Sequence, residues 1–557
     1  MSADLPEETQ LYLSLVNAPA STGNFPLPGV TDSSTKKLVE KLKTNYTDNS
    51  AFFAGTIFHN HVMDHLLAMW GVGATADALE EVYVTHDYEE PVQPSPEPIT
   101  DSNFVAHLGD PDFYSAYMVY FCKKLTKASV TGVLERFVFS AAYNVDTGLS
   151  HDKKTLKAGE RHPEMLGRVM SGLLHPLIHI GYGAEFGILQ QVAEGAYFPR
   201  ITCAQTAIHP DDQTPNTPLH LFTSADKYGR GLSKLALPAR SSGPPPFLSF
   251  HSAIAADPRF GTAALGFVRP KDGEDPVMGE LEYAKISEIV GTAVAQLASE
   301  WYDRWIVGVP EDELEDRLQQ MVEEVIVGNV YWYAVAGFAG RGKEVFNADL
   351  YTRVSALALP MHFVTSSIFL PTLALPPGRT KASTLDPPLS LASRLLLIRA
   401  YLAACAVWYI ARYRPTNASM SISAFYAATG ARLAQPPAPH AYAPGKAPRR
   451  DFFKNCQKTV PFGASGWLRV VQSAVVHPNE HLIKLVRALG AFDLWYGARG
   501  LGAYAGALNG AEELDGTLFL RAAVLTMDRL GWAYEEEPLA LWDKRGYFDC
   551  ADGENAS

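Results

Sequence analysis

The chain has 557 residues, of which 47% are hydrophobic and 19% charged, the composition of an ordinary globular protein. Its net charge of −13 argues against nucleic acid or an anionic membrane surface as the main partner. The five cysteines are scattered and lack CxxC spacing, so they indicate neither a disulfide framework nor a zinc ribbon. We therefore expect a reducing, cytoplasmic location.

No secretory or membrane-spanning segment is expected. The first ten residues are acidic and polar, unlike a signal peptide. The longest apolar run, residues 400–411, is shorter than the roughly 18 residues that a membrane span needs. This run is better interpreted as a buried helix of a soluble protein.

The chain begins with an expected arm over residues 1–20, followed by one large helical domain over 21–545 and a polar tail over 546–557. A charged helix is predicted near residues 36–43. Residues 58–70 then read as an apolar helix that contains His59, His61 and His65 and ends near Gly71.

Helical spacing dominates the rest of the sequence, and no strand–helix alternation or repeat period is present. Proline-rich loops are expected at 203–246, 371–388 and 435–448. The fold class predicted is therefore all-α, as a single large multi-helix domain with long loops. The expected helices cover residues 113–127, 129–143, 163–193, 281–305, 312–336, 347–370, 390–413, 466–476, 479–491 and 512–530.

Two pairs of histidines are spaced four residues apart, His61 with His65 and His175 with His179. On a helix this spacing places both rings of a pair on one face, whereas His59 would point nearly the opposite way. Two such helices can aim four neutral imidazoles at one point, a common way to hold a transition metal. Lone histidines are more often ordinary core or surface residues, but burying several without partners is costly.

Further histidines stand in organised surroundings: His362 in an apolar helix and His481 near a helix start. Asp64 and Glu185 lie close enough to the paired faces to orient imidazoles, or they are simply solvated charges. The candidate metal ligands are His61, His65, His175, His179, His362 and His481, of which we expect three or four to bind.

Two glycine-rich stretches resemble nucleotide-binding motifs only weakly. Residues 337–343 match GxxxxGK, but Glu344 follows where that loop needs Ser or Thr. Residues 500–506 follow a helical segment where a dinucleotide fingerprint needs a strand. No flavin fingerprint stands near the N-terminus, and no GxSxG nucleophile elbow is present.

The histidine motifs taken in order resemble the questin oxidase-like family, over roughly residues 20–540. The motifs are Asn60-His61-x-x-x-His65-x-Leu67, His175-Pro176-Leu177-Ile178-His179-x-Gly181-Tyr182-x-x-Glu185, His362-x-Val364-Thr365-Ser366 and His481-Leu482-x-Lys484-x-x-Arg487-Ala488-Leu489. The resemblance implies oxidative cleavage or Baeyer–Villiger oxidation of an anthraquinone-like polyketide in secondary-metabolite biosynthesis. It also implies O₂ as co-substrate, with NADPH as a reductant or non-haem iron as a cofactor.

One branch of that family resembles an iron site of four histidines and a carboxylated lysine. We expect that lysine in the helix over 390–413, where Arg399 stands instead. Arginine stays charged and is no metal ligand. Lys381 is the nearest alternative, in a loop rich in proline and glycine.

Three functions remain open from the sequence. The first is a metal-dependent oxygenase acting on a polycyclic aromatic ketone at a histidine-bound iron. The second is an NADPH-dependent oxidoreductase without a catalytic metal, and the third is a non-catalytic helical protein that binds a ligand.

Overall fold

The computed structural model describes residues 5–53, 58–144, 163–197, 244–266, 279–335, 360–411, 420–434 and 466–535, except residues 88, 262, 380, 381 and 507, and a few positions near 540. Lys381, residues 337–343, most of the loops at 203–246 and 435–448, and the tail at 546–557 lie outside these ranges.

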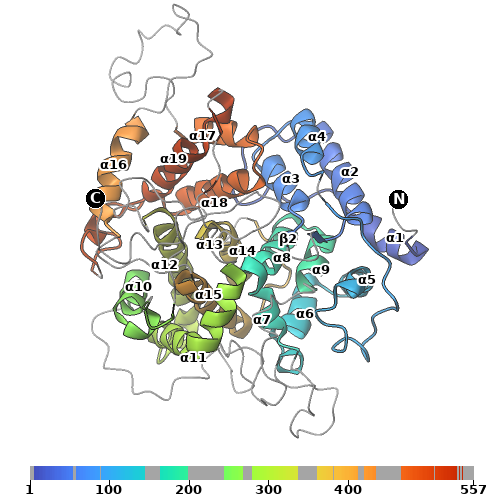
Figure 1. The fold of residues 1–557 in the computed structure, drawn as a ribbon, viewed down its shortest axis with the longest axis horizontal. Helices are drawn as coiled ribbons and strands as arrows, with labels where there is room; N and C mark the ends of the chain where they lie inside the picture. The colour runs from blue at the N-terminus through green and yellow to red at the C-terminus, as the bar shows by residue number, and fades with distance from the viewer. Residues whose placement is uncertain are drawn as a thin grey trace, which may run out of the picture.

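The described chain is built from helices, which confirms the all-α prediction (Figure 1). Two-residue strands β1 (Phe52–Phe53) and β2 (Phe58–His59) form one short antiparallel pair. The first nine α-helices are α1 (Glu7–Ser14), α2 (Asp32–Asp48), α3 (Val62–Gly71), α4 (Ala76–Val84), α5 (Tyr114–Leu125), α6 (Val130–Leu134), α7 (Met165–Val169), α8 (His175–Phe186) and α9 (Leu189–Ala196).

The remaining ten α-helices include the longest of the described chain, α11 (Gly279–Ile306). They are α10 (Phe247–Ala256), α11, α12 (Leu314–Ala334), α13 (Pro360–Ser367), α14 (Phe369–Ala374), α15 (Leu391–Ala411), α16 (Ile422–Ala434), α17 (Gly466–Val475), α18 (Glu480–Tyr496) and α19 (Leu518–Leu530). The region expected to be one helix over 163–193 is instead divided among α7, the 3₁₀ turn η4 (Gly172–Leu174), α8 and α9. The expected N-terminal arm also contains a helix, α1.

The helices α3, α8, α13 and α18 meet in the interior of the molecule. Figure 1 places α13 near the centre of the view, with α18 above it and α3 and α8 toward the N-terminal side. α18 packs against both α3 and α13, and α8 also contacts α3 and α13. Segments that are far apart in sequence therefore share one core.

α15 is a long, apolar and buried helix. It is the described helix that is long and apolar enough to cross a membrane by length and composition, but its apolar window is entirely buried inside the protein. It packs against α11, α12 and α14. This is the position of a core helix, as expected for the apolar run at 400–411.

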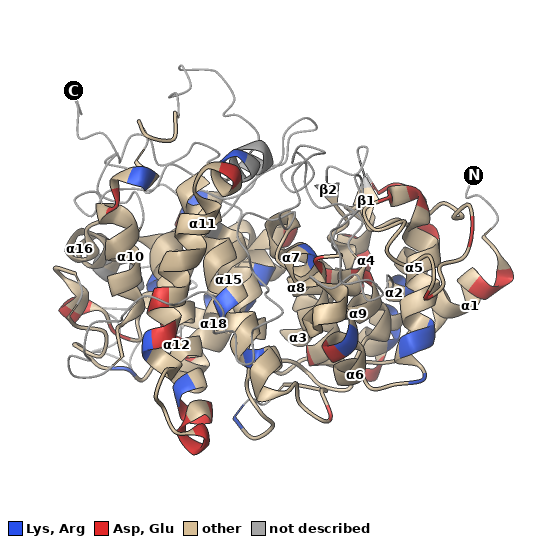
Figure 2. Ribbon diagram, turned by 90° about the horizontal axis from the view of Figure 1, so that it is seen from below, with Lys and Arg blue, Asp and Glu red and all other residues tan. Residues whose placement is uncertain are grey.

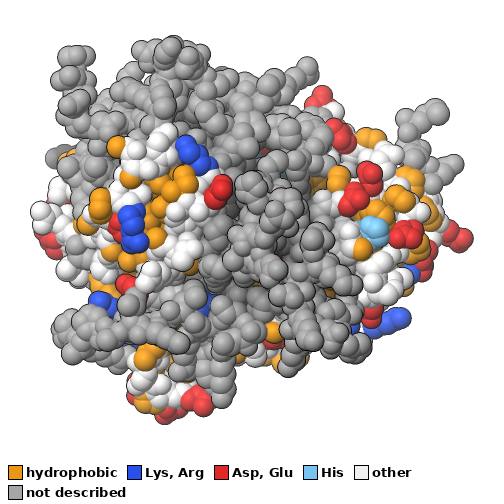
Figure 3. Space-filling model, turned by 60° about the horizontal axis from the view of Figure 1, so that its bottom comes forward, with side chains coloured by type: hydrophobic (Ala, Val, Ile, Leu, Met, Phe, Trp, Pro, Cys, Tyr) orange, Lys and Arg blue, Asp and Glu red, His pale blue; other side chains and the backbone are white. Residues whose placement is uncertain are grey.

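Basic and acidic residues are spread over many of the helices, with both signs interspersed (Figure 2). The face in Figure 3 likewise shows acidic and basic side chains among small apolar patches. In contrast to these exposed charges, several charged and imidazole side chains are buried between α3, α8, α9 and α18. They form the candidate site.

Candidate metal centre

The first histidine segment is positioned by Asn60, just before α3. Its side-chain amide donates to Asn45 Oδ1 and Ser50 O, both at 3.0 Å, and its Oδ1 accepts from the backbone N–H of Val62 at 3.0 Å. The helix therefore begins at Val62, with His61 at the N-cap position. His59 lies in β2, so the prediction that it points away from His61 on a continuous helix was wrong.

The second segment is positioned by an unusual backbone turn before α8. Gly172, Leu173 and Leu174 all have positive φ, of 52°, 58° and 66°. Leucine rarely adopts this conformation, which costs roughly 1–2 kcal/mol per residue. The turn brings the Gly172 carbonyl to 2.6 Å from Nδ1 of His175.

This contact determines which nitrogen of His175 carries the proton. A carbonyl oxygen can only accept, so the Nδ1–H of His175 donates to it. Nε2 therefore keeps its lone pair, and this atom is buried without a hydrogen-bond partner among the described residues. A ring held by Nδ1–H to a carbonyl, with Nε2 left over, is the usual arrangement of a metal-ligating histidine.

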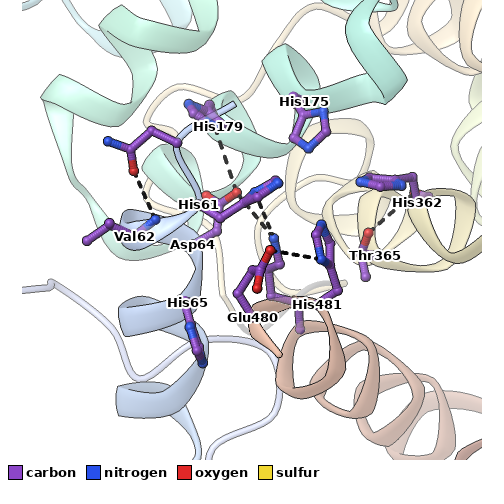
Figure 4. Close-up of polar contacts among 12 residues, drawn as sticks. His61, Val62, Asp64, His65, His175, His179, His362, Thr365, Glu480 and His481 are labelled. Atoms are coloured by element: carbon purple, nitrogen blue, oxygen red, sulfur yellow. Dashed lines mark hydrogen bonds and ion pairs between the residues drawn. The ribbon is translucent and has the colours of Figure 1, made fainter. Parts of the chain in front are cut away.

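Further histidines complete a group that we call the histidine cluster: His61, His175, His362 and His481 (Figure 4). The ligand atoms of His61, His175 and His481 all lie within 4.8 Å of one another. The His362 ring lies 4.8 Å from that of His175 and 5.3 Å from that of His481, between centroids. The cluster draws one ring each from the ends or faces of α3, α8, α13 and α18.

The His481 ring is oriented at the start of α18. Asn479 caps this helix, because its Oδ1 accepts from the backbone N–H of His481 at 3.0 Å. The Glu480 carboxylate lies 3.2 Å from Nδ1 of His481. A carboxylate beside one ring nitrogen favours use of the other nitrogen toward a metal.

Burial keeps the imidazoles of His61 and His175 neutral. It is the main cause that lowers the pKa of His61 and His175 well below the usual value, and the charge of Lys484 lowers the pKa of His61 further. His59 stacks on His175 with 4.1 Å between ring centroids, and burial lowers its pKa to about 3. A neutral imidazole is the form that binds a metal ion.

The second member of each i,i+4 pair has other partners. Nδ1 of His65 lies 3.1 Å from Nε2 of His86, and the His65 side chain points away from the cluster in Figure 4. His179 has a carboxylate beside each nitrogen: Glu194 Oε2 at 2.9 Å from Nδ1 and Asp64 Oδ2 at 3.7 Å from Nε2. The structure thus brings together His61, His175, His362 and His481, and it places His65 and His179 outside that group.

A buried lysine that sequence reasoning gave no role reaches the cluster. Nζ of Lys484 lies 3.1 Å from Nδ1 of His61 and 3.9 Å from Oδ2 of Asp64. Arg399, in the helix where we expected a lysine, is buried in α15. Lys484 could have been found from the sequence, because it lies one helical turn after His481 in the otherwise largely apolar segment 482–489.

Glu185 does not orient an imidazole, contrary to one of the alternatives above. Its carboxylate is buried in an ion pair with Arg487 and accepts the backbone N–H of Asn24. It therefore connects α8 and α18 to the N-terminal segment. Asp64, in contrast, does lie beside a ring, that of His179.

The geometry of the cluster fits a transition metal. With metal–nitrogen bonds of about 2.1 Å, ligand nitrogens lie about 3 Å apart at right angles and about 4.2 Å apart when opposite. The ligand atoms of His61, His175 and His481 lie within 4.8 Å of one another, which is slightly more than these nitrogen–nitrogen distances. Rotations of the side chains would bring the atoms to the distances that a bound metal requires. A donor set of imidazoles without thiolates suits iron, copper, nickel or zinc.

Fold and site together define a helical protein with an internal centre of several histidines. The chain belongs to the questin oxidase-like family, whose model matches residues 58–489, which confirms the resemblance described above. The match includes all four histidines of the cluster and Lys484.

Three curated fungal relatives illustrate the family. The chain is 24% identical to "Oxidoreductase AflY" of Aspergillus parasiticus over 57% of this chain and 52% of the relative. It is 24% identical to "Baeyer-Villiger monooxygenase dmxR6" of Cryptosporiopsis sp. over 63% of this chain and 66% of that one. A "Questin oxidase" of Aspergillus terreus is 24% identical over 28% of this chain and 32% of its own length. These alignments span about half to two thirds of the first two relatives.

Proposed function

We propose that this protein is an oxygenase that oxidises a polycyclic aromatic ketone of the anthraquinone type at an iron held by the histidine cluster. The observation that carries the proposal is the state of the His175 ring. Its Nδ1–H donates to the Gly172 carbonyl, so its buried Nε2 keeps a lone pair that can bind a metal ion. The names of the relatives support the reaction class and the type of substrate. A cytoplasmic location remains our expectation.

In this proposal His61, His175, His362 and His481 hold the ion. A bound iron would supply the redox chemistry and an open coordination position for O₂. The chain supplies four imidazoles and a fixed tautomer at His175, in an interior without bulk water, since all four rings are buried. Exclusion of water strengthens every electrostatic interaction in such a site and limits side reactions.

Two reaction types are consistent with the relatives' names. They differ in how many atoms of O₂ enter the product. Baeyer–Villiger oxidation inserts one oxygen atom between the carbonyl carbon and its neighbour; the second atom becomes water, with two electrons from a reductant such as NADPH. Ring cleavage by dioxygenation places both oxygen atoms in the product and needs no external reductant.

The proposal is tested by expressing the full chain with iron, measuring bound metal by mass spectrometry, and incubating it with questin and ¹⁸O₂. We expect one bound iron per chain and a product with one or two labelled atoms. His175→Ala and His481→Ala should remove the iron and the O₂ consumption while leaving far-UV circular dichroism nearly unchanged. His251→Gln is the matched control, because His251 is equally buried but contacts Trp332, Tyr331 and Tyr409 instead.

A wild-type protein that carries no metal and consumes NADPH would replace this proposal with the metal-free oxidoreductase. Stoichiometric iron in His175→Ala would show that this ring is not a ligand. Loss of iron in His251→Gln as well would mean that the readout reports general destabilisation.

A further inference from the structure

A buried group of hydroxyl and amide side chains holds α13, the short helix that carries His362. The Tyr401 hydroxyl of α15 donates to the backbone carbonyl of Phe363, the residue after His362, at 3.0 Å. Ser366 Oγ, one turn further along α13, lies 2.7 Å from the same hydroxyl. The side-chain amide of Asn329, from α12, donates to it at 3.0 Å. One tyrosine oxygen therefore connects three helices.

The chemistry of its members determines which atom donates in each of these bonds. A carbonyl oxygen can only accept and an amide nitrogen can only donate, so Tyr401 gives its proton to Phe363 and accepts from Asn329. The Ser366 hydroxyl then donates to the second lone pair of the tyrosine oxygen. The side chains of Tyr401, Ser366 and Asn329 are completely buried and uncharged. The group therefore holds α13 through neutral hydrogen bonds that water does not reach.

α13 depends on such contacts because it is short. It spans Pro360–Ser367, and helices shorter than about 12–15 residues are marginal without tertiary packing. Ser366 follows His362 by four residues, so the two side chains lie on the same face of the helix. Figure 4 shows His362 on this helix, with its ring at the edge of the cluster. A rotation or shift of α13 that breaks the bonds to Tyr401 would therefore also displace the His362 ring.

The two helices that hold α13 support each other independently of the cluster. α12 packs against both α13 and α15. Trp332 of α12 stacks on Tyr409 of α15, with 4.3 Å between ring centroids and 4° between ring planes. The Trp332 ring also lies 5.9 Å from that of Phe363. Neither α12 nor α15 carries a histidine of the cluster, so this support does not need a bound metal.

We propose that Tyr401, together with Asn329 and Ser366, is a positioning residue that fixes α13 so that the His362 ring meets the other three rings of the histidine cluster. This inference rests on the proposed function, because it assigns a role relative to the metal centre. His362 is the member of the cluster outside the set of three whose ligand atoms lie within 4.8 Å of one another. Its contribution as a ligand therefore depends most on where its helix is held.

The test compares three tyrosine-to-phenylalanine variants of the full-length protein, each of which removes one buried hydroxyl. Tyr401→Phe removes the bonds to α13. Tyr333→Phe removes a hydrogen bond of 2.7 Å to Thr526 of α19, a helix without a histidine of the cluster. Tyr331→Phe removes a hydroxyl that has no hydrogen-bond partner in the part of the chain that the structure describes. The last two variants are matched controls, one for a bond lost elsewhere and one for the loss of a hydroxyl alone.

Each metal-free protein is titrated with Co²⁺ alone, which reports stoichiometry, affinity and ligand geometry through its visible absorption. Tyr401→Phe should still bind one Co²⁺, with shifted absorption bands and affinity lowered about 10-fold, the lower end of the range for outer-shell partners of metal sites. Tyr333→Phe and Tyr331→Phe should match the wild type in both. The midpoint of thermal unfolding should fall in Tyr401→Phe and Tyr333→Phe but not in Tyr331→Phe, because only the first two lose a hydrogen bond.

A double-mutant cycle tests whether Tyr401 acts through His362. His362→Ala should bind Co²⁺ more weakly than the wild type, because His61, His175 and His481 remain. In that background Tyr401→Phe should cause no further loss of affinity, since the ring that it positions is absent. A further 10-fold loss would show that the hydroxyl acts on the site by another route and would overturn the proposal.

The remaining outcomes are equally distinct. An affinity and a spectrum of Tyr401→Phe equal to those of the wild type would overturn the positioning role while leaving the metal centre intact. An equal loss of affinity in Tyr333→Phe would show that any lost buried hydrogen bond weakens the site, and would overturn it too. A wild-type protein that binds no Co²⁺ would overturn the proposed function and this inference together.

Discussion

Glu324 of α12 is a carboxylic acid whose ionisation opposes folding. Its Oε2 accepts the backbone N–H of Phe247 at 2.7 Å, at the start of α10. Burial raises the pKa of this carboxyl from 4.5 to about 7, and the Phe247 N–H offsets only part of that rise. The folded protein therefore keeps the proton at pH values where the unfolded chain releases it. The stability contributed by the neutral form is complete below pH 4.5 and is lost as the pH rises toward 7.

Glu324→Gln should remove this pH dependence, because glutamine imitates the protonated acid and keeps an oxygen for the Phe247 N–H. Relative to the wild type, the variant should gain free energy of unfolding with rising pH between about 5 and 6.5, by at most about 1.4 kcal/mol per pH unit. Denaturant unfolding at several pH values measures the difference. Glu311→Gln, at an exposed position, should show no such trend. A constant difference between Glu324→Gln and wild type across this range would contradict the assignment.

Individual residues show where sequence reasoning succeeded. Pair spacing marked His61 and His175, and apolar or helix-start surroundings marked His362 and His481. These four do converge, because histidines in apolar segments are expected to be buried together. The i,i+4 rule misplaced His65 and His179, because His61 precedes its helix and His175 is the first residue of its own. Lys484 could not be assigned, since its role depends on neighbours that are hundreds of residues away in the sequence.

Among the helices, α8 illustrates what local patterns can and cannot predict. Its helical character follows from the sequence. Its termination at Gly187, with φ of 77°, was not predicted, since one helix was expected over residues 163–193. Its start was not predicted either, because two leucines adopt left-handed conformations that only tertiary packing can impose. Gly181 permits a close approach of α14 to this helix, since an added Cβ would lie 2.1 Å from Cγ of Phe369.

Gly181→Ala should therefore destabilise the protein by about 1–3 kcal/mol through overpacking between α8 and α14. Combining it with Phe369→Leu should recover part of that loss, so the two changes should be less destabilising together than the sum of each alone. Thermal and denaturant unfolding measure both. Gly500→Ala is the control, since nothing lies within 4 Å of its added Cβ. Strict additivity of the Gly181 and Phe369 changes would argue against a direct clash.

Across the whole molecule, α18 connects the two halves of the chain. It packs against α3 from the first half and against α13, α17 and α19 from the second. It also carries His481, Lys484 and Arg487, the last paired with Glu185 of α8. A fragment that lacks α18 loses part of the site and exposes the faces that α18 covers.

A fragment of residues 1–434 should therefore neither bind Co²⁺ nor unfold cooperatively, whereas the full chain should show one cooperative transition. Circular dichroism during thermal unfolding and Co²⁺ titration test this expectation. A sharp transition in the fragment, close to that of the full chain, would show that the first 434 residues fold independently.

The distance along the chain between the two sides of the site has a consequence for biosynthesis. Lys484 and His61 are in contact but stand 423 residues apart. At about 5–20 residues per second, a ribosome needs roughly 20–80 s to make the chain between them. During that interval His61 and then His175 are synthesised while the α18 that covers them does not yet exist. In the cell, nascent chains of this protein should therefore depend on chaperones to protect that apolar surface, and a metal bound at the proposed site would be acquired only after α18 has been synthesised.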